Sequence, residues 1–128
     1  MEELIGRIVA NVGVEPELAK TAIGLILGFL QKEGPQDKIE SLMGALPGAA
    51  ELVSQTHSGG GGLMGAIGGM MGGGGGAMAL MGQLTGAGLG MGDIQGVAKE
   101  VVGYAKEKAG DGLVEDVVGS IPGLGQFV

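Results

Sequence analysis

An uncharged, glycine-rich stretch at residues 58–92 is the feature that most constrains how this sequence can fold. The stretch has 35 residues, of which 17 are glycine, and it contains no Asp, Glu, Lys or Arg. All of the chain's 7 basic and 14 acidic side chains lie in the two flanks, residues 1–57 and 93–128. Gly-rich chains behave as flexible coils, whereas the flanks carry aliphatic residues at helical spacing. We therefore expect two folded units joined by a Gly-rich connector.

The two flanks also resemble each other, which is typical of an internal repeat: several segments match at one fixed offset, and the upstream segments 4–6 and 12–14 match 80–82 and 89–91 at slightly larger offsets, as short insertions in loops would produce. We call the difference in residue number between Leu27 and Val102 the repeat offset. Three pairs of segments match at it: 27–29 with 102–104, 44–48 with 119–123, and 52–53 with 127–128. The second pair, Gly-Ala-Leu-Pro-Gly and Gly-Ser-Ile-Pro-Gly, is specific because it matches more than glycines. The sequence predicts a tandem duplication with three parts: a first repeat at residues 1–57, a Gly/Met-rich linker at 58–79 and a second repeat at 80–128.

Each repeat is predicted to be all-α, with about three helices. In the first repeat, an apolar stripe at residues 4–12 precedes Gly13, which ends helices readily because glycine tolerates positive φ. A second helix is expected from Pro16, since proline is favoured in the first turn of a helix. After a break at residues 34–37, a third helix runs to the Pro-Gly pair at 47–48, and a short helical turn follows it.

The second helix of the first repeat is apolar nearly all round. Between residues 18 and 32, four side chains are polar: Lys20, Thr21, Gln31 and Lys32. A helix of this kind must be buried on several sides, so it is either the central helix of a bundle or packs against another copy of the chain. We expect four of its side chains to point inward: Leu25, Ile26, Phe29 and Leu30.

Four residues of the same helix are interface candidates for a second copy: Ile23, Gly24, Leu27 and Gly28. With the inward face as given, Ile23 and Leu27 are expected to face a partner. Gly24 and Gly28 lie four residues apart on one ridge, where small residues let two helix backbones approach closely. The alternative is that each glycine makes room for a large neighbour within the repeat.

The second repeat has the same order of helices but a more exposed central helix. Six residues form the apolar stripe of that helix: Ile94, Val97, Ala98, Val101, Val102 and Ala105. Four residues form the stripe of the next helix: Val114, Val117, Val118 and Ile121. Five charged residues of the central helix leave a solvated face: Lys99, Glu100, Lys106, Glu107 and Lys108.

Residues 59–82 are uncharged over a length that could cross a membrane. The run of five glycines at residues 72–76 would cost about 4–5 kcal/mol in helical form, so a flexible linker is the expectation and a spanning helix is disfavoured. A strict four-residue spacing within this segment would also suit close helix packing: Gly61, Gly65, Gly69 and Gly73.

The methionines of the same segment offer another interpretation. Met64, Met70 and Met71 carry soft thioether groups of the kind that bind Cu(I). They are scattered through the segment rather than set in tight repeats, and methionine is also a flexible gap-filler of apolar interfaces. We therefore expect no metal site.

No combination of residues predicts catalysis, so we expect a non-enzymatic protein with no cofactor and no small-molecule substrate. The chain has no cysteine, and its one histidine, His57, is expected in a polar loop without the base-and-nucleophile arrangement of a hydrolase. The carboxylate pairs at residues 37/40 and 115/116 lie near expected helix starts, where acidic side chains complement the helix dipole. The Gly-rich runs lack the Lys and Ser/Thr of a phosphate-binding loop.

Charge restricts the classes of partner. The formal charge is −7 and no basic stripe is present, which argues against nucleic acid and disfavours adhesion to anionic membranes. The acidic N-terminus, Met-Glu-Glu-Leu, lacks the basic region and long apolar run of a signal peptide, so a cytoplasmic location is expected.

Several segments resemble a small bacterial domain family of unknown function, VcgC/VcgE. They are Val-Gly-Val-Glu-Pro-Glu-Leu-Ala at 12–19, then Gly24 and Leu27, then Leu-Pro-Gly at 46–48, and Leu-Gly-Met-Gly-Asp at 89–93 after the Gly-rich middle. The resemblance implies a helical fold and brings no catalytic residues. The sequence thus predicts an acidic helical interaction or assembly module that associates with itself or with another protein. The alternative is a membrane-associated protein that buries residues 59–82 in lipid.

Overall fold

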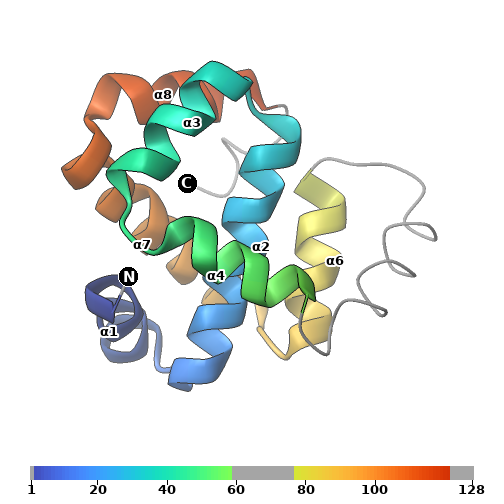
Figure 1. Cartoon of the computed structure of the whole chain (residues 1–128). Helices are drawn as coiled ribbons and strands as arrows, with labels where there is room; N and C mark the ends of the chain where they lie inside the picture. Colours follow the sequence, from blue (N-terminus) through green and yellow to red (C-terminus); the bar gives the residue numbers. More distant parts are fainter. Residues whose placement is uncertain (1, 59–76, 122–128) are drawn as a thin grey trace.

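The computed structural model describes residues 2–58 and 77–121, and within these ranges all regular secondary structure is helical. The described helices are α1 (Glu2–Val12), α2 (Pro16–Glu33), α3 (Gln36–Ala45), α4 (Ala49–Ser58), α6 (Ala77–Ala87), α7 (Met91–Ala109) and α8 (Asp111–Ser120). Figure 1 shows these helices gathered around α2. The all-α prediction is confirmed. Most of the expected linker, residues 59–76, lies outside the described residues.

The first helix boundaries follow from local chain chemistry. Gly13 has φ of 87°, and its amide donates a hydrogen bond of 3.1 Å to the carbonyl oxygen of Val9, which ends α1. Pro16 then begins α2, where its missing N–H removes no helical hydrogen bond. Both boundaries agree with the prediction from the sequence.

The end of α3 and the start of α4 are set by the Leu-Pro-Gly segment. Leu46 is extended (φ −106°, ψ 95°), as expected for a residue that precedes proline, and Gly48 has φ of 85°. The helix that follows, α4, has 10 residues, so it is longer than the short turn predicted from the sequence. Leu52 and Val53 of α4 are each 7% exposed. Since α4 packs more extensively against α2 than any other helix does, tertiary burial explains its length.

The helix α2 is the centre of the bundle. It contacts α4, α6, α1, α7 and α3, so different neighbours cover different sides of it. Its nearly uniform apolar composition is therefore satisfied by helices of the same chain. Of the two arrangements that the sequence left open, the structure has the central helix of a bundle.

The helices on both sides of the Gly-rich stretch share one hydrophobic core. The first helix of each half packs more extensively against the long helix of the other half than against its own: α1 against α7, and α6 against α2. The residues expected in two successive repeats are thus interleaved in space and do not form two separate cores.

Close helix packing joins α1 to α7. A β-carbon added to Gly96 of α7 would lie 2.8 Å from the Cγ2 atom of Val12, so the glycine lets α1 approach the backbone of α7. At the same seam, the side-chain amide of Asn11 donates a hydrogen bond of 2.9 Å to Glu100. A third link joins α3 to α8, where the Nζ atom of Lys38 is 2.7 Å from a carboxylate oxygen of Asp116.

The strongest polar link between α1 and α7 is the pair of Arg7 and Glu107. The guanidinium donates two hydrogen bonds to the carboxylate, at 2.5 and 3.0 Å. These bonds and the attraction between the charges lower the pKa of Glu107 and raise the pKa of Arg7 from their usual values. The Cζ atom of Arg7 also lies 5.8 Å from the centre of the Tyr104 ring, which is a cation–π contact.

Candidate interaction site

The residues predicted as an interface lie inside the chain's own core. Ile23 and Leu27 are 0% and 1% exposed, and Gly24 and Gly28 are also buried. Leu25, one of the residues expected to point inward, is only partly buried. The expectation that Ile23 and Leu27 face a partner is therefore corrected, because neighbouring helices of the same chain bury both side chains.

A different surface is open, between α7 and α8. Gly110 is the single residue between these helices, and its φ of 98° allows the chain to turn sharply there. The two helices enclose a groove of about 480 Å³. Among the described residues, its lining consists of Lys99, Val102, Gly103 and Lys106 from α7, and Glu115, Val118 and Gly119 from α8.

The floor of the groove is apolar and has room for a side chain or helix. Val102 and Val118 are partly buried, and they line the groove together with Gly103 and Gly119. A β-carbon added to either glycine would meet no atom of the described residues within 4 Å. The two glycines therefore leave open space in the groove instead of serving a close contact within the described part of the chain.

The rim of the groove carries charge. Lys99 and Lys106 lie seven residues apart on α7, about two helical turns, and neither is among the described ion pairs, which engage Arg7 and Lys38. Glu115 lies on the opposite rim. On a chain with a formal charge of −7, these lysines form a local basic rim above an apolar floor.

Comparison of α7 with α2 shows why this surface is open. At the repeat offset, three groove residues, Lys99, Val102 and Gly103, correspond to Gly24, Leu27 and Gly28 of α2. The three α2 residues are buried, whereas the α7 residues are exposed or partly buried. The sequence analysis found the exposed character of α7 but not the groove. The sequence signal that could have identified the groove is Lys99, which occupies the position that corresponds to Gly24 in the first repeat.

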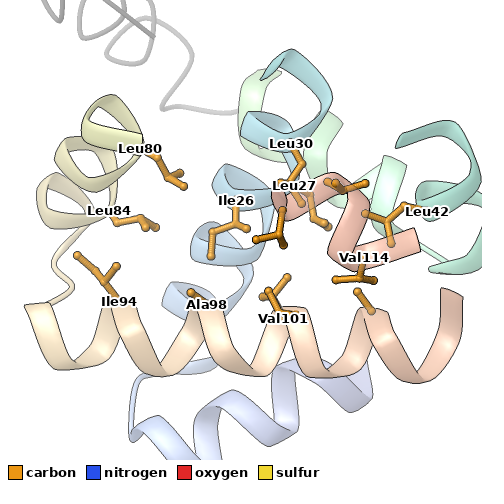
Figure 2. A pocket seen from close by; sticks show the side chains of 14 residues that line it. Ile26, Leu27, Leu30, Leu42, Leu80, Leu84, Ile94, Ala98, Val101 and Val114 are labelled. Carbon is orange, nitrogen blue, oxygen red and sulfur yellow. The ribbon is translucent and has the colours of Figure 1, made fainter. Parts of the chain in front are cut away.

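Behind the groove lies a cavity of about 30 Å³ within the core. Val102 and Val118 line both the groove and the cavity, so they form the wall between the two. Figure 2 shows side chains from α2, α6, α7 and α8 pointing into this space, among them Leu27, Leu84 and Val101. The described residues of the lining are all aliphatic, and their side chains offer no hydrogen-bond partner to a water molecule.

The other residues singled out in the sequence lie apart from the groove or outside the described ranges, except Glu115 on its rim. His57 lies in α4 and not in the expected loop, because α4 extends to Ser58. Asp37, Glu40, Glu115 and Asp116 are all exposed. The methionines of the copper alternative and the four-residue glycine series fall at residues 61–73, outside the described residues.

None of the helices in the described ranges combines the length and the apolar character that crossing a bilayer requires. Within these ranges, the exposed large apolar side chain is Met91, at 62%. Met91 is not among the described residues that line the groove between α7 and α8.

The chain shows no significant similarity to a curated protein or to a solved structure. A family model does match, over residues 1–122, and its description is protein of unknown function VcgC/VcgE (DUF2780). The match covers nearly the whole chain and confirms the resemblance found in the short sequence motifs. The chain belongs to the VcgC/VcgE family of proteins of unknown function.

Proposed function

We propose that this protein is a non-enzymatic interaction module that self-associates, with the groove between α7 and α8 as its binding surface. The observation that carries the proposal is the combination of an open apolar floor with a basic rim on an acidic chain. Burial of Val102 and Val118 under a partner removes apolar surface from water, which favours association.

Charge supports a second copy as the partner. Lys99 and Lys106 have no ion-pair partner among the described contacts, and the remaining surface of the chain is rich in carboxylates. Complementary charges of this kind steer association and set its orientation. Another protein with an acidic helix is the alternative partner that the same chemistry allows.

We also propose that the chain arose by tandem duplication. Three pairs of helices support this history, because each later helix starts at the repeat offset from its counterpart: α1 and α6, α2 and α7, α3 and α8. Within this scheme, residues 1–57 and 80–128 are the repeats, and the exchange of first helices between them produces the shared core. The groove then belongs to the second repeat alone.

The mass of the chain in solution tests self-association. Light scattering over a range of concentrations is expected to show a mass that rises above 12.5 kDa. Replacing both rim lysines, with Lys99→Glu and Lys106→Glu, is expected to weaken association at least about tenfold, since it places carboxylates against carboxylates.

The matched control replaces Lys20 and Lys32, two exposed lysines of α2, by glutamate. It changes the net charge by the same amount but leaves the groove intact, so its association is expected to match the parent within about threefold. A parent chain that keeps the monomer mass at every concentration would refute the proposal. If the substitutions at Lys20 and Lys32 weakened association as much as those at Lys99 and Lys106, the groove would be refuted as the interface.

A further inference from the structure

The groove between α7 and α8 and the cavity behind it are separated only by the wall of Val102 and Val118. The groove measures about 480 Å³ and the cavity about 30 Å³. Both wall residues are partly buried, and the described lining of the cavity is aliphatic (Figure 2). The cavity exceeds the roughly 10–15 Å³ that a water-sized group needs, and its lining favours an apolar group. The two spaces together therefore suit a ligand with a long apolar part.

The described charged side chains of the groove lie at its rim. On α7, four lining residues follow the spacing i, i+3, i+4 and i+7 and so share one face of the helix: Lys99, Val102, Gly103 and Lys106. The two lysines flank the apolar pair, and neither takes part in a described ion pair. Glu115 lies on the opposite rim, on α8, so an anionic group is favoured on the α7 side of the groove.

We infer that the groove binds a fatty acid. Its carboxylate lies at Lys99 and Lys106, its acyl chain lies along the floor, and its methyl end passes between Val102 and Val118 into the cavity. Each ammonium group sits on a flexible four-carbon stem, so both lysines can approach one carboxylate. A mostly apolar site with a few polar groups at one end is typical of sites for small ligands.

The depth of the site favours an acyl chain over a protein segment. A helix is about 10–12 Å wide with its side chains, so it can lie over the floor of the groove but cannot pass the wall. An unbranched chain of methylene groups is narrow enough to pass when the two valine side chains change rotamer. The fatty acid site shares the groove with the proposed self-association but does not depend on it. Because both ligands cover the same floor, each is expected to weaken the binding of the other.

Calorimetric titration of the full-length protein with octanoate, decanoate and dodecanoate, each below its micelle-forming concentration, tests the site. One fatty acid is expected to bind per chain. The affinity is expected to rise about tenfold with each added pair of methylene groups, because a longer chain buries more apolar surface. A titration with dodecanoate that shows no saturable binding would overturn the inference.

Replacing both rim lysines, with Lys99→Gln and Lys106→Gln, tests the place of the carboxylate. This change is expected to weaken binding of decanoate about five- to tenfold, since two exposed ionic contacts are lost, and to leave binding of the neutral decanol unchanged. The matched control, Lys20→Gln with Lys32→Gln, removes two exposed charges of α2 outside the described lining of the groove. Equal affinity of the two double variants for decanoate would contradict the assignment.

Two variants that fill the cavity test the place of the methyl end. Val101→Ile and Ala98→Val each add apolar atoms to the cavity lining. Each is expected to reduce the gain in affinity from decanoate to dodecanoate to about twofold or less, because the chain end no longer reaches buried space, and to leave binding of octanoate unchanged.

The control for filling is Val53→Ile, which adds one methylene group at a buried position of α4 outside the described lining of the cavity. It is expected to keep the full dependence on chain length, and circular dichroism checks that each variant is folded. If both filling variants also kept that dependence, the chain would not enter the cavity and the inference would fail.

Light scattering with and without saturating dodecanoate separates the fatty acid site from self-association. A parent that associates but binds no dodecanoate would leave the proposed function in place and refute the fatty acid site. A chain that is monomeric at every concentration but binds dodecanoate through the two rim lysines would refute self-association and support the site. If both occur, dodecanoate is expected to lower the mass toward that of the monomer. An unchanged mass would assign the second copy to another surface and leave the fatty acid site supported.

Discussion

The guanidinium of Arg7 and the carboxylate of Glu107, which are far apart in the chain, form two hydrogen bonds that join α1 to α7. The pair lies beside Tyr104, whose ring is also contacted by Lys108 at 5.6 Å. Both ionic groups are partly exposed, at 32% and 55% of their side-chain surface. Their main effect is to fix where α1 lies on α7, because burial of the neighbouring aliphatic residues provides most of the free energy.

Acidification is expected to remove the contribution of this pair. Because the pKa of Glu107 is lowered in the folded state, the ion pair stabilises the protein above the unfolded pKa, near 4.5, and this stabilisation is lost as the pH falls through the lowered value. Glu107→Gln should therefore be less stable than the parent at neutral pH, and the difference should shrink as the pH falls below the usual pKa of glutamate. Urea unfolding of the variant and the parent at several pH values measures this difference in stability. Glu40→Gln, at an exposed position of α3, is the control, and a difference that grows on acidification would contradict the expectation.

Two Gly→Ala variants are expected to change the free energy of unfolding in opposite directions, because Val12 lies against one of the two glycines, Gly96. Alanine at position 96 would place its β-carbon 2.8 Å from Val12, so Gly96→Ala is expected to destabilise by about 1–2 kcal/mol despite its better helix propensity. Gly82→Ala in α6 meets no atom within 4 Å and should stabilise by up to about 1 kcal/mol. Thermal unfolding measures both. Adding Val12→Ala should relieve the clash, and failure of this second change to reduce the effect of Gly96→Ala would argue against it.

Gly34 is required by close approach and not by its backbone angles. Its φ is −83°, which any residue adopts, but a β-carbon there would lie 2.7 Å from the carbonyl oxygen of Leu30 and 2.8 Å from Ile39. A backbone atom cannot move aside as a side chain can, so Gly34→Ala is expected to cost about 1–3 kcal/mol. Gly44→Ala in α3, where a β-carbon has open space, provides the comparison in urea unfolding. Equal stability of the two variants would show that the turn between α2 and α3 can relax.

The cavity predicts opposite effects for two aliphatic changes. Leu27→Ala, at 1% exposure on the cavity wall, should destabilise by about 2–5 kcal/mol because it enlarges the cavity. Val101→Ile adds one methylene group beside a space of about 30 Å³ and should stabilise by about 0.5–1 kcal/mol. Chemical denaturation of both variants checks the prediction. A destabilised Val101→Ile variant would show that the added group points into packed atoms instead of the cavity.

The helices of the first half could be predicted closely from local signals. Gly13, Pro16 and Pro47 stop or start helices through their own backbone restrictions, and these signals need no tertiary context. The length of α4 could not be predicted, because its sequence from Ala49 to Ser58 is only weakly patterned and its helix depends on packing against α2. The apolar composition of α2 predicted burial on several sides but left open whether helices of the same chain or a second copy provide it.

The groove was not predicted, although two of its residues were named in the sequence as part of two apolar stripes. Periodicity places Val102 and Val118 on inward faces, but it does not show which helix lies across each face. The same limit explains the correction at Ile23 and Leu27, because an apolar pattern does not distinguish a neighbouring helix of the same chain from a partner.

Glycine, proline and 3.6-residue periodicity act over a few residues, so the helical class and the ends of the first helices could be predicted from the sequence alone. The tertiary structure decided that α1 packs on α7 and α6 on α2, and that the open surface lies on the second half of the chain. The hydrophobic effect rewards burial of aliphatic surface without specifying the partner, so the choice of partner depends on shape, such as the space that Gly96 leaves for Val12.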